Sequence, residues 1–158
     1  MVVLLTFQAG GDMSMSNAAE AALLDLMFLN TDWAGVGDAG GLQNSATAGS
    51  FYIALHTADP GEAGTQTTSE IAYTSYARVA VARSAGGWTR SVSTVSNTAL
   101  VQFPQCTGGS GTATYFSIGQ DASGAGQIIL SGALSASLSI SNGIQPQFAA
   151  AALTATLD

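Results

Sequence analysis

Two hydrophobic periods follow one another along this 158-residue chain, the first typical of a helix and the second typical of strands. One face of the helical stretch is formed by Ala19, Ala22, Leu23, Leu26 and Met27. This spacing predicts a helix with that face buried. Asn17 is the expected N-cap, with Glu20 three residues later in a capping-box-like arrangement, and the helix should end near Asn30. The residues 31–50 are rich in glycine and small polar residues, which predicts a long irregular connection.

From Phe51 onward apolar and polar residues alternate, as they do in half-buried β-strands. The alternation and the turn-forming clusters between the runs predict strands at residues 51–57, 77–83, 98–103, 112–119, 127–132, 133–141 and 147–157. Residues 127–132 include a short continuous apolar run, which predicts burial on both faces of that strand. In residues 133–141 apolar residues alternate with serine, so one face should be buried and the other exposed.

This order of elements predicts a mainly β protein. We expect an antiparallel β-sandwich, jelly-roll-like, of about 7–8 strands, preceded by one N-terminal α-helix. The strands do not alternate with helices, which disfavours a doubly wound α/β fold. We divide the chain into an N-terminal extension (residues 1–15), a helix with its glycine-rich connection (16–50) and a β-sandwich domain (51–158).

Charge is scarce and mostly negative: the chain has 10 acidic residues, three arginines, no lysine and a net charge of −7. This balance argues against a nucleic-acid partner, because Lys and Arg supply most of the affinity for phosphates. No apolar run approaches the ~20 residues of a membrane span, so we expect no membrane partner. The single cysteine, Cys106, rules out an intrachain disulfide. A surface poor in charge suits contact with protein neighbours, and we expect self-association as a homo-oligomer.

The segment IALHTADPGEAG contains the only histidine of the chain, His56, followed by Asp59 and Glu62. Such a trio could bind a divalent cation or act in acid–base chemistry, although a metal site usually needs further ligands from other elements. The alternative is a strand that ends in a turn, because Asp59, Pro60 and Gly61 have the residue types of a β-turn. The turn composition favours the second interpretation, so we expect no metal site and no cofactor.

A catalytic function has little support in the sequence. A hydrolase would use His56 as its only imidazole base, with one of many serines as the nucleophile, and no GxSxG motif is present. The glycine stretches GVGDAGG and GGSGTA do not match phosphate-binding fingerprints. Carboxylates for glycoside cleavage could come from Asp59, Glu62 and Glu70, but nothing fixes their separation. We expect that the protein is not an enzyme, with a hydrolase that uses His56 as the outlying alternative.

Aromatic and arginine side chains are the candidates for a protein interface. The candidate interface residues are Trp33, Tyr73, Tyr76, Arg78, Arg83, Trp88 and Arg90. Trp and Tyr are favoured as interface anchors, and a buried arginine would pair with a carboxylate through two hydrogen bonds. Two alternatives stay open: the rings could plug the ends of the sandwich, and the arginines could form exposed salt bridges that contribute little.

Several segments resemble a family of small virion proteins of tailed bacteriophages, many of which are labelled as tail fibre proteins. The similar segments are SNAAEAALLDLMF, FYIALHTADPGEAG, SYARVAV, NTALVQFP and FAAAALTATLD. They extend from Ser16 to Asp158, and the most specific are the LHTADPGEAG turn with the following SYARVAV and the C-terminal FAAAALTATLD. Two parts depart from the family pattern: the extension Met1–Gly11 and the segment SAGGWTRSVST.

The resemblance implies a non-enzymatic structural component of a phage particle. Small β-sandwich proteins of this size also serve phages as capsid cement or decoration proteins. The absence of a fibrous repeat favours a cement protein on the outer surface of the capsid, in contact with the major capsid protein. The alternative is a tail-fibre or tail-tip module that contacts a receptor on the host surface.

Overall fold

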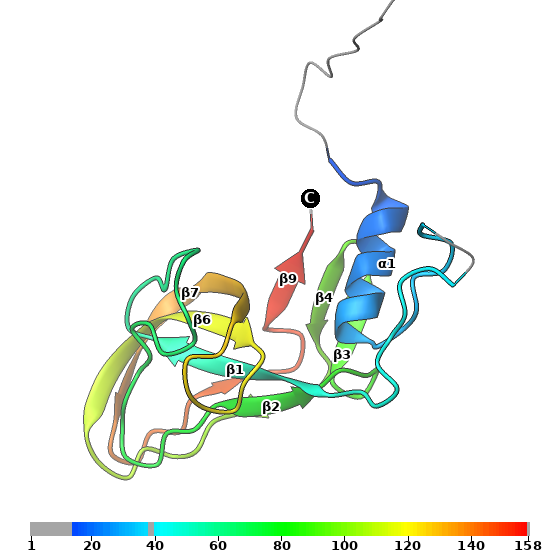
Figure 1. Ribbon diagram of the computed structural model, residues 1–158. Helices are drawn as coiled ribbons and strands as arrows, with labels where there is room; N and C mark the ends of the chain where they lie inside the picture. The colour runs from blue at the N-terminus through cyan, green and yellow to red at the C-terminus, as the bar shows by residue number, and fades with distance from the viewer. Residues whose placement is uncertain (1–13, 38–39, 158) are drawn as a thin grey trace, which may run out of the picture.

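The computed structural model describes residues 14–37 and 40–157 (Figure 1). Its elements are α1 (Asn17–Phe28), β1 (Ser50–His56), β2 (Val79–Ala82), β3 (Trp88–Ser91), β4 (Thr94–Asn97), β5 (Val101–Gln102), β6 (Ser110–Gly119), β7 (Ile128–Ser141), β8 (Gln147–Phe148) and β9 (Thr154–Thr156). All strand pairs are antiparallel. The predicted mainly β fold with one helix near the N-terminus is therefore confirmed. The predicted extension, residues 1–15, lies outside the described residues except for Ser14 and Met15, and the other two domain boundaries stay predictions.

The helix α1 begins one residue earlier than predicted and buries a different face. Ser16 is the N-cap, and its hydroxyl accepts a hydrogen bond from the N–H of Ala19. The buried positions are Glu20, Leu24 and Phe28, so the predicted buried face was wrong. Apolar residues surround most of this helix, and the spacing alone could not show which of them would face the core. The large Phe28 ring decides the orientation, because it packs in the core against other aromatic rings.

The largest sheet has the strand order β2-β1-β6-β7, and β1 lies inside it. At the end of β1 both faces are buried, since the residues from Ile53 to His56 are at most 1% exposed. Alternation predicted that Ile53 and Leu55 would point to one face, with Ala54 and His56 on the opposite face. Both faces are covered because residues 57–78 fold back over the sheet as a long loop (Figure 1).

The strand β7 unites two strands that the sequence predicted separately, at residues 127–132 and 133–141. It pairs with β6, with a register shift between Ala113 and Tyr115. The prediction that residues 127–132 are buried on both faces was wrong, because β7 lies at an edge of the sheet and leaves all of these residues partly or fully exposed. The alternation in residues 133–141 is confirmed at Leu138 and Ile140, which are more buried than the serines beside them.

A second sheet has the order β3-β4-β9, and the hairpin of β3 and β4 was not predicted. Ser91 pairs with Thr94, so Val92 and Ser93 form a two-residue loop. The φ angle of Val92 is 54°, a positive value that hairpin loops usually obtain from Gly or Asn. Because neither residue is present, the hairpin carries no conventional turn signal. The helix α1 packs against this hairpin (Figure 1).

One hydrophobic core joins the helix to the sheets. Its largest fully buried side chains include Trp88, Phe28 and Phe103. The ring centroid of Phe28 lies 4.8 Å from that of Trp88 and 5.1 Å from that of Phe51, so one helical residue contacts both the β3 strand and the β1 strand. Among the described residues, none of the helices is long and apolar enough to cross a membrane.

Candidate functional site

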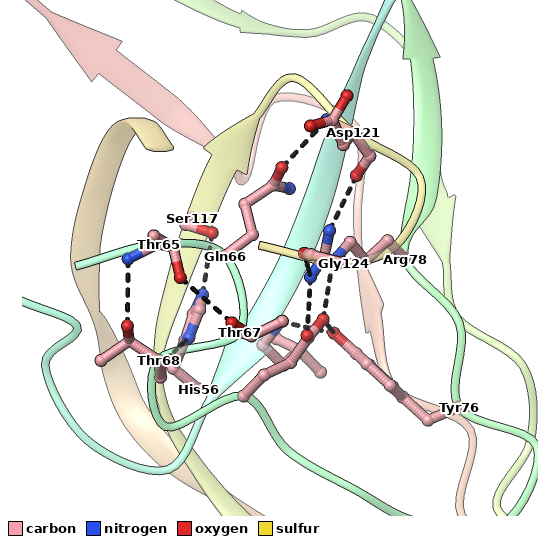
Figure 2. A network of polar contacts seen from close by, with 12 residues as sticks. His56, Thr65, Gln66, Thr67, Thr68, Tyr76, Arg78, Ser117, Asp121 and Gly124 are labelled. Carbon is pink, nitrogen blue, oxygen red and sulfur yellow. Dashed lines mark hydrogen bonds and ion pairs between the residues drawn. The ribbon is translucent and has the colours of Figure 1, made fainter. Parts of the chain in front are cut away.

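The polar side chains with the greatest capacity for acid–base or nucleophilic chemistry lie together where the loop 57–78 covers the sheet (Figure 2). We call this group the buried polar network, and it comprises His56, Gln66, Glu70, Tyr76, Arg78 and Ser117. The loop returns antiparallel to the end of β1: the N–H of Thr57 donates to the carbonyl of Ser69, and the N–H of Ile71 donates to the carbonyl of Leu55. This return places the polar side chains of the loop directly over the sheet.

His56 is fully buried at the end of β1. Its Nδ1 lies 2.8 Å from the carbonyl oxygen of Thr68, and its Nε2 lies 2.8 Å from Oγ of Ser117 (Figure 2). A carbonyl oxygen only accepts hydrogen bonds, so Nδ1 carries the proton and Nε2 of the neutral ring accepts from the Ser117 hydroxyl. Burial lowers the pKa of His56 below its ordinary value, and the hydrogen bond to Thr68 opposes this effect. The ring is therefore neutral at pH 7.

Glu70 and Arg78 form a nearly buried ion pair, with side chains that are 16% and 2% exposed. Nε and Nη2 of Arg78 each lie 2.7 Å from a different carboxylate oxygen of Glu70, which is the bidentate geometry. Tyr76 donates its hydroxyl proton to Glu70 over 3.0 Å, and its oxygen accepts the N–H of Leu55 over 3.1 Å. Burial is the main cause that raises the pKa of Tyr76 above its ordinary value. These bonds fix the loop to the backbone of β1.

The remaining N–H groups of Arg78 extend the network to the turn between β6 and β7. They donate to the carbonyl oxygens of Asp121 and Gly124, over 2.9 Å and 2.8 Å (Figure 2). Gln66 contacts the same turn, because its Oε1 accepts the N–H of Asp121 over 2.9 Å. A Cβ on Gly119 or on the glycine at position 126 would overlap the Gln66 side chain, so both positions need glycine.

The pair of Ser117 and His56 has the hydrogen bond of a catalytic Ser–His dyad, but a substrate cannot reach it. Both residues have 0% exposure, and neither lines the large groove beside β7 or the smaller one beside β2. The partner of Nδ1 is a carbonyl, so no carboxylate orients the ring as in a triad. Serine nucleophiles act at a surface open to substrate, which leaves a structural role as the interpretation that the geometry supports.

The acids that follow His56 in the sequence lie away from its ring. Asp59 is exposed, and its Oδ1 accepts the N–H of Gly61 over 2.9 Å, as expected of an Asp-initiated turn. Gly61 has a φ of 69°, the left-handed conformation that glycine adopts without strain. Glu62 is exposed as well. In residues 14–37 and 40–157, no three His, Cys, Asp or Glu side chains are close enough to hold a metal ion.

The other two arginines of the candidate interface contact the helix α1. Arg83 donates from Nε to the carbonyl of Met27 and from Nη2 to the carbonyl of Leu26, over 2.5 Å and 2.8 Å. Its guanidinium also lies over the Phe51 ring, 5.6 Å from the centroid. Arg90 pairs with Asp25 over 2.5 Å and is partly exposed. All three arginines thus have partners inside the chain, and their role in an interface stays a prediction.

The four aromatic candidates differ in their environment. Trp88 is 1% exposed and Tyr73 is 6% exposed, so both rings contribute to packing in the described chain. The Tyr73 hydroxyl donates to the carbonyl of Pro104 over 2.8 Å, and burial raises its pKa to about 12. Trp33 is half-buried in the long connection, where it pairs with Leu42 through backbone hydrogen bonds. These contacts agree with the alternative in which the aromatic rings pack within the chain. The assignment of the four aromatic residues to a protein interface stays a prediction.

The sequence analysis named His56, Glu70, Tyr76 and Arg78 but did not bring them together. It missed Ser117 and Gln66 entirely. Ser117 is one serine among many, and only the pairing of β1 with β6 places it on the same face as His56. Gln66 lies in a loop rich in threonine, where polar side chains are usually exposed to solvent. The only sequence feature related to the burial of Gln66 is the pair of glycines at positions 119 and 126, which leave room for its side chain.

The described chain is a mainly β protein whose long loop is held on its largest sheet by buried polar contacts. Comparison with known protein families identifies the family to which the chain belongs. The chain belongs to the family described as "Podophage GP4 fiber I protein gp80", whose model matches residues 14–156. This match confirms the resemblance to structural proteins of the phage virion, and it places the chain in the virion. The comparison with curated proteins gave no match.

Proposed function

We propose that this chain is a structural subunit of a fibre on the particle of a tailed phage. The observation that supports this most directly is the family match, which spans residues 14–156 and whose description names a fibre protein. In this function the protein contributes a rigid shape and contact surfaces rather than a reaction. The buried polar network supports such a role, because the bonds of Glu70 and Arg78 hold the long loop firmly on the sheet.

A second candidate is a cement protein on the outer surface of the capsid, in contact with the major capsid protein. The helix and the strands of the described chain share one hydrophobic core, and no lengthwise repeat is seen in the sequence. A small globular block of this kind can also lie between capsid subunits. Both candidates are structural proteins of the virion, and they differ in position and in copy number.

The two candidates can be separated on purified particles with gold-labelled antibodies against this protein and electron microscopy. A fibre subunit should give label on the tail or neck, in few copies per particle. Label spread over the head in many copies would overturn the fibre proposal and support the cement function. Quantitative mass spectrometry of the same particles gives the copy number independently of how well the antibody reaches its epitope.

If the fibre contacts the host surface, the purified protein should compete with phage particles for the receptor. Host cells incubated with an excess of the protein should then adsorb fewer particles than cells incubated with a heat-denatured sample. Unchanged adsorption would contradict a receptor contact by this chain, while the labelling experiment would still decide its place in the particle.

A further inference from the structure

A large groove lies beside β7, the 14-residue strand at an edge of the largest sheet. Its volume is about 740 Å³, and its walls come mainly from β6, β7 and the segment 146–156. The apolar side chains that line it include Phe116, Leu134, Leu138 and Phe148, which are only partly buried in the described chain. An apolar surface of this kind usually marks a contact site in a globular protein, because burying it removes apolar surface from water.

An apolar segment of the same chain has a composition that fits this groove. Residues 1–13 lie outside the described part of the chain, and their sequence is MVVLLTFQAGGDM. All residues from Val2 to Phe7 are apolar except Thr6, and the only charged side chain of the segment is Asp12. Apolar side chains in such a cluster are usually buried, because exposing them to water is unfavourable. The segment Val2–Phe7 thus matches the apolar walls of the groove in chemistry.

The position of α1 shows where this segment joins the described chain. Phe28, the last residue of α1, contacts Trp88 at the start of β3, and Asp25 pairs with Arg90 further along β3. The helix therefore runs antiparallel to β3, and its first turn lies near the tip of the β3–β4 hairpin. The two described residues that precede the N-cap are exposed. Residues 1–13 are thus attached to the surface of the molecule at the hairpin tip.

The groove reaches the same end of the molecule. Thr156 of β9 lines the groove and pairs with Thr94 at the tip of that hairpin. Figure 1 shows that the end of β9 and the start of α1 lie at the same end of the molecule. β9 is two strands away from β3 in its sheet, which corresponds to about 10 Å. Residues 8–13 span up to about 20 Å when extended, so they are long enough to connect the helix with a segment Val2–Phe7 in the groove.

We propose that the segment Val2–Phe7 binds in the groove beside β7 of its own chain. A segment that is attached close to its binding site has a high effective concentration there, which favours it over the same segment of another molecule. The contact joins apolar side chains to the groove walls and needs no backbone pairing with the β7 edge, whose ladder with β6 contains register shifts. The segment lies outside the family match, which starts at residue 14, so the inference concerns this chain and goes beyond the proposed function.

The first experiment replaces Leu4 of the 158-residue chain by the photo-cross-linking amino acid p-benzoylphenylalanine. The control carries the same group in place of Ser91, an exposed residue of β3 that does not line the groove. After irradiation, mass spectrometry of the peptides should show that position 4 is joined to residues 128–138 or 146–156 in a product with the mass of one chain, and that position 91 is not. Cross-links from position 4 to other segments, or none at all, would overturn the proposal. A groove cross-link found only in products with the mass of two chains would also overturn it, because a neighbouring copy would then supply the segment.

A second experiment measures how open the groove is to solvent with the dye ANS, which binds to exposed apolar surface. Leu4→Asp should raise the ANS fluorescence of the folded protein at least about twofold, because a carboxylate is disfavoured in an apolar groove and the segment should leave it. Gln8→Asp places the same charge in the polar part of the segment and should leave the fluorescence close to that of the wild type. Circular dichroism of both variants should match the wild type, which separates opening of the groove from unfolding. A Leu4→Asp variant that binds no more ANS than Gln8→Asp would contradict the proposal.

Discussion

His56 is held in its neutral form by its burial, while its hydrogen bond to the Thr68 carbonyl fixes the tautomer and opposes the lowering of the pKa. Its pKa in the folded protein is lower than the ordinary value of 6.5 that applies to the unfolded chain. The unfolded state therefore binds more protons between these two pKa values, and stability rises with pH across that window. The full contribution is present above pH 6.5 and is lost as the pH falls towards the folded pKa.

We expect the free energy of unfolding of the wild type to decrease below pH 6.5, by at most about 1.4 kcal/mol per pH unit from this residue. His56→Gln cannot take up a proton and should show a smaller slope over the same window. Urea unfolding at a series of pH values measures both slopes, so a lower overall stability of the variant does not obscure the result. Equal slopes would show that His56 does not titrate in this way.

At the scale of elements, the helix α1 is attached to the sheets at its C-terminal end by an arginine. The guanidinium of Arg83 donates to the last-turn carbonyls of Leu26 and Met27, which have no partners inside the helix. The position also favours a positive charge because of the helix dipole. One side chain thus fixes the end of the helix next to β2 and packs over the Phe51 ring.

Arg83→Lys should lower the free energy of unfolding by about 1–2 kcal/mol, because an ammonium group cannot reproduce the planar fork that reaches both carbonyls. The matched control is Arg90→Lys, which alters a more exposed contact to Asp25 of the same helix and should cost less than about 1 kcal/mol. Thermal and urea unfolding of the two variants provide the comparison. A larger loss for Arg90→Lys than for Arg83→Lys would contradict this account of the helix end.

At the scale of the whole molecule, the ion pair of Glu70 and Arg78 connects segments that lie far apart in the sequence. It joins the loop 57–78 to β1 through Tyr76 and to the β6–β7 turn through two carbonyl oxygens. Removing one partner would leave a nearly buried charge without compensation, whereas removing both removes that penalty. The two changes should therefore not be additive.

Arg78→Met should destabilise the protein by about 3–5 kcal/mol, because Glu70 would lose its counter-charge. The double variant Glu70→Gln with Arg78→Met should be less destabilised than the sum of the two single variants. Urea unfolding of the four proteins completes a double-mutant cycle. Simple additivity of the two changes would show that the ion pair contributes no coupling energy.

Much of the architecture followed from local chemistry. The alternation in FYIALHT predicted β1, and Asp59, Pro60 and Gly61 predicted the turn after it, because the side-chain period and the turn residues act over a few positions. The hairpin at Val92 could not be predicted in this way, because its positive φ occurs without the usual glycine or asparagine. The buried face of α1 could not be predicted either, because it is set by the packing of the Phe28 ring against Phe51 and Trp88.

The sequence by itself determined that this protein is mainly β, poor in charge and similar to structural proteins of phage particles, because period, composition and motif are properties of the chain. Only the tertiary structure decided what His56 does. The pairing of β1 with β6 brings Ser117 to its ring, and the folded-back loop shields both from solvent. Contacts between residues 61 positions apart depend on strand register and on packing, and no local pattern specifies them.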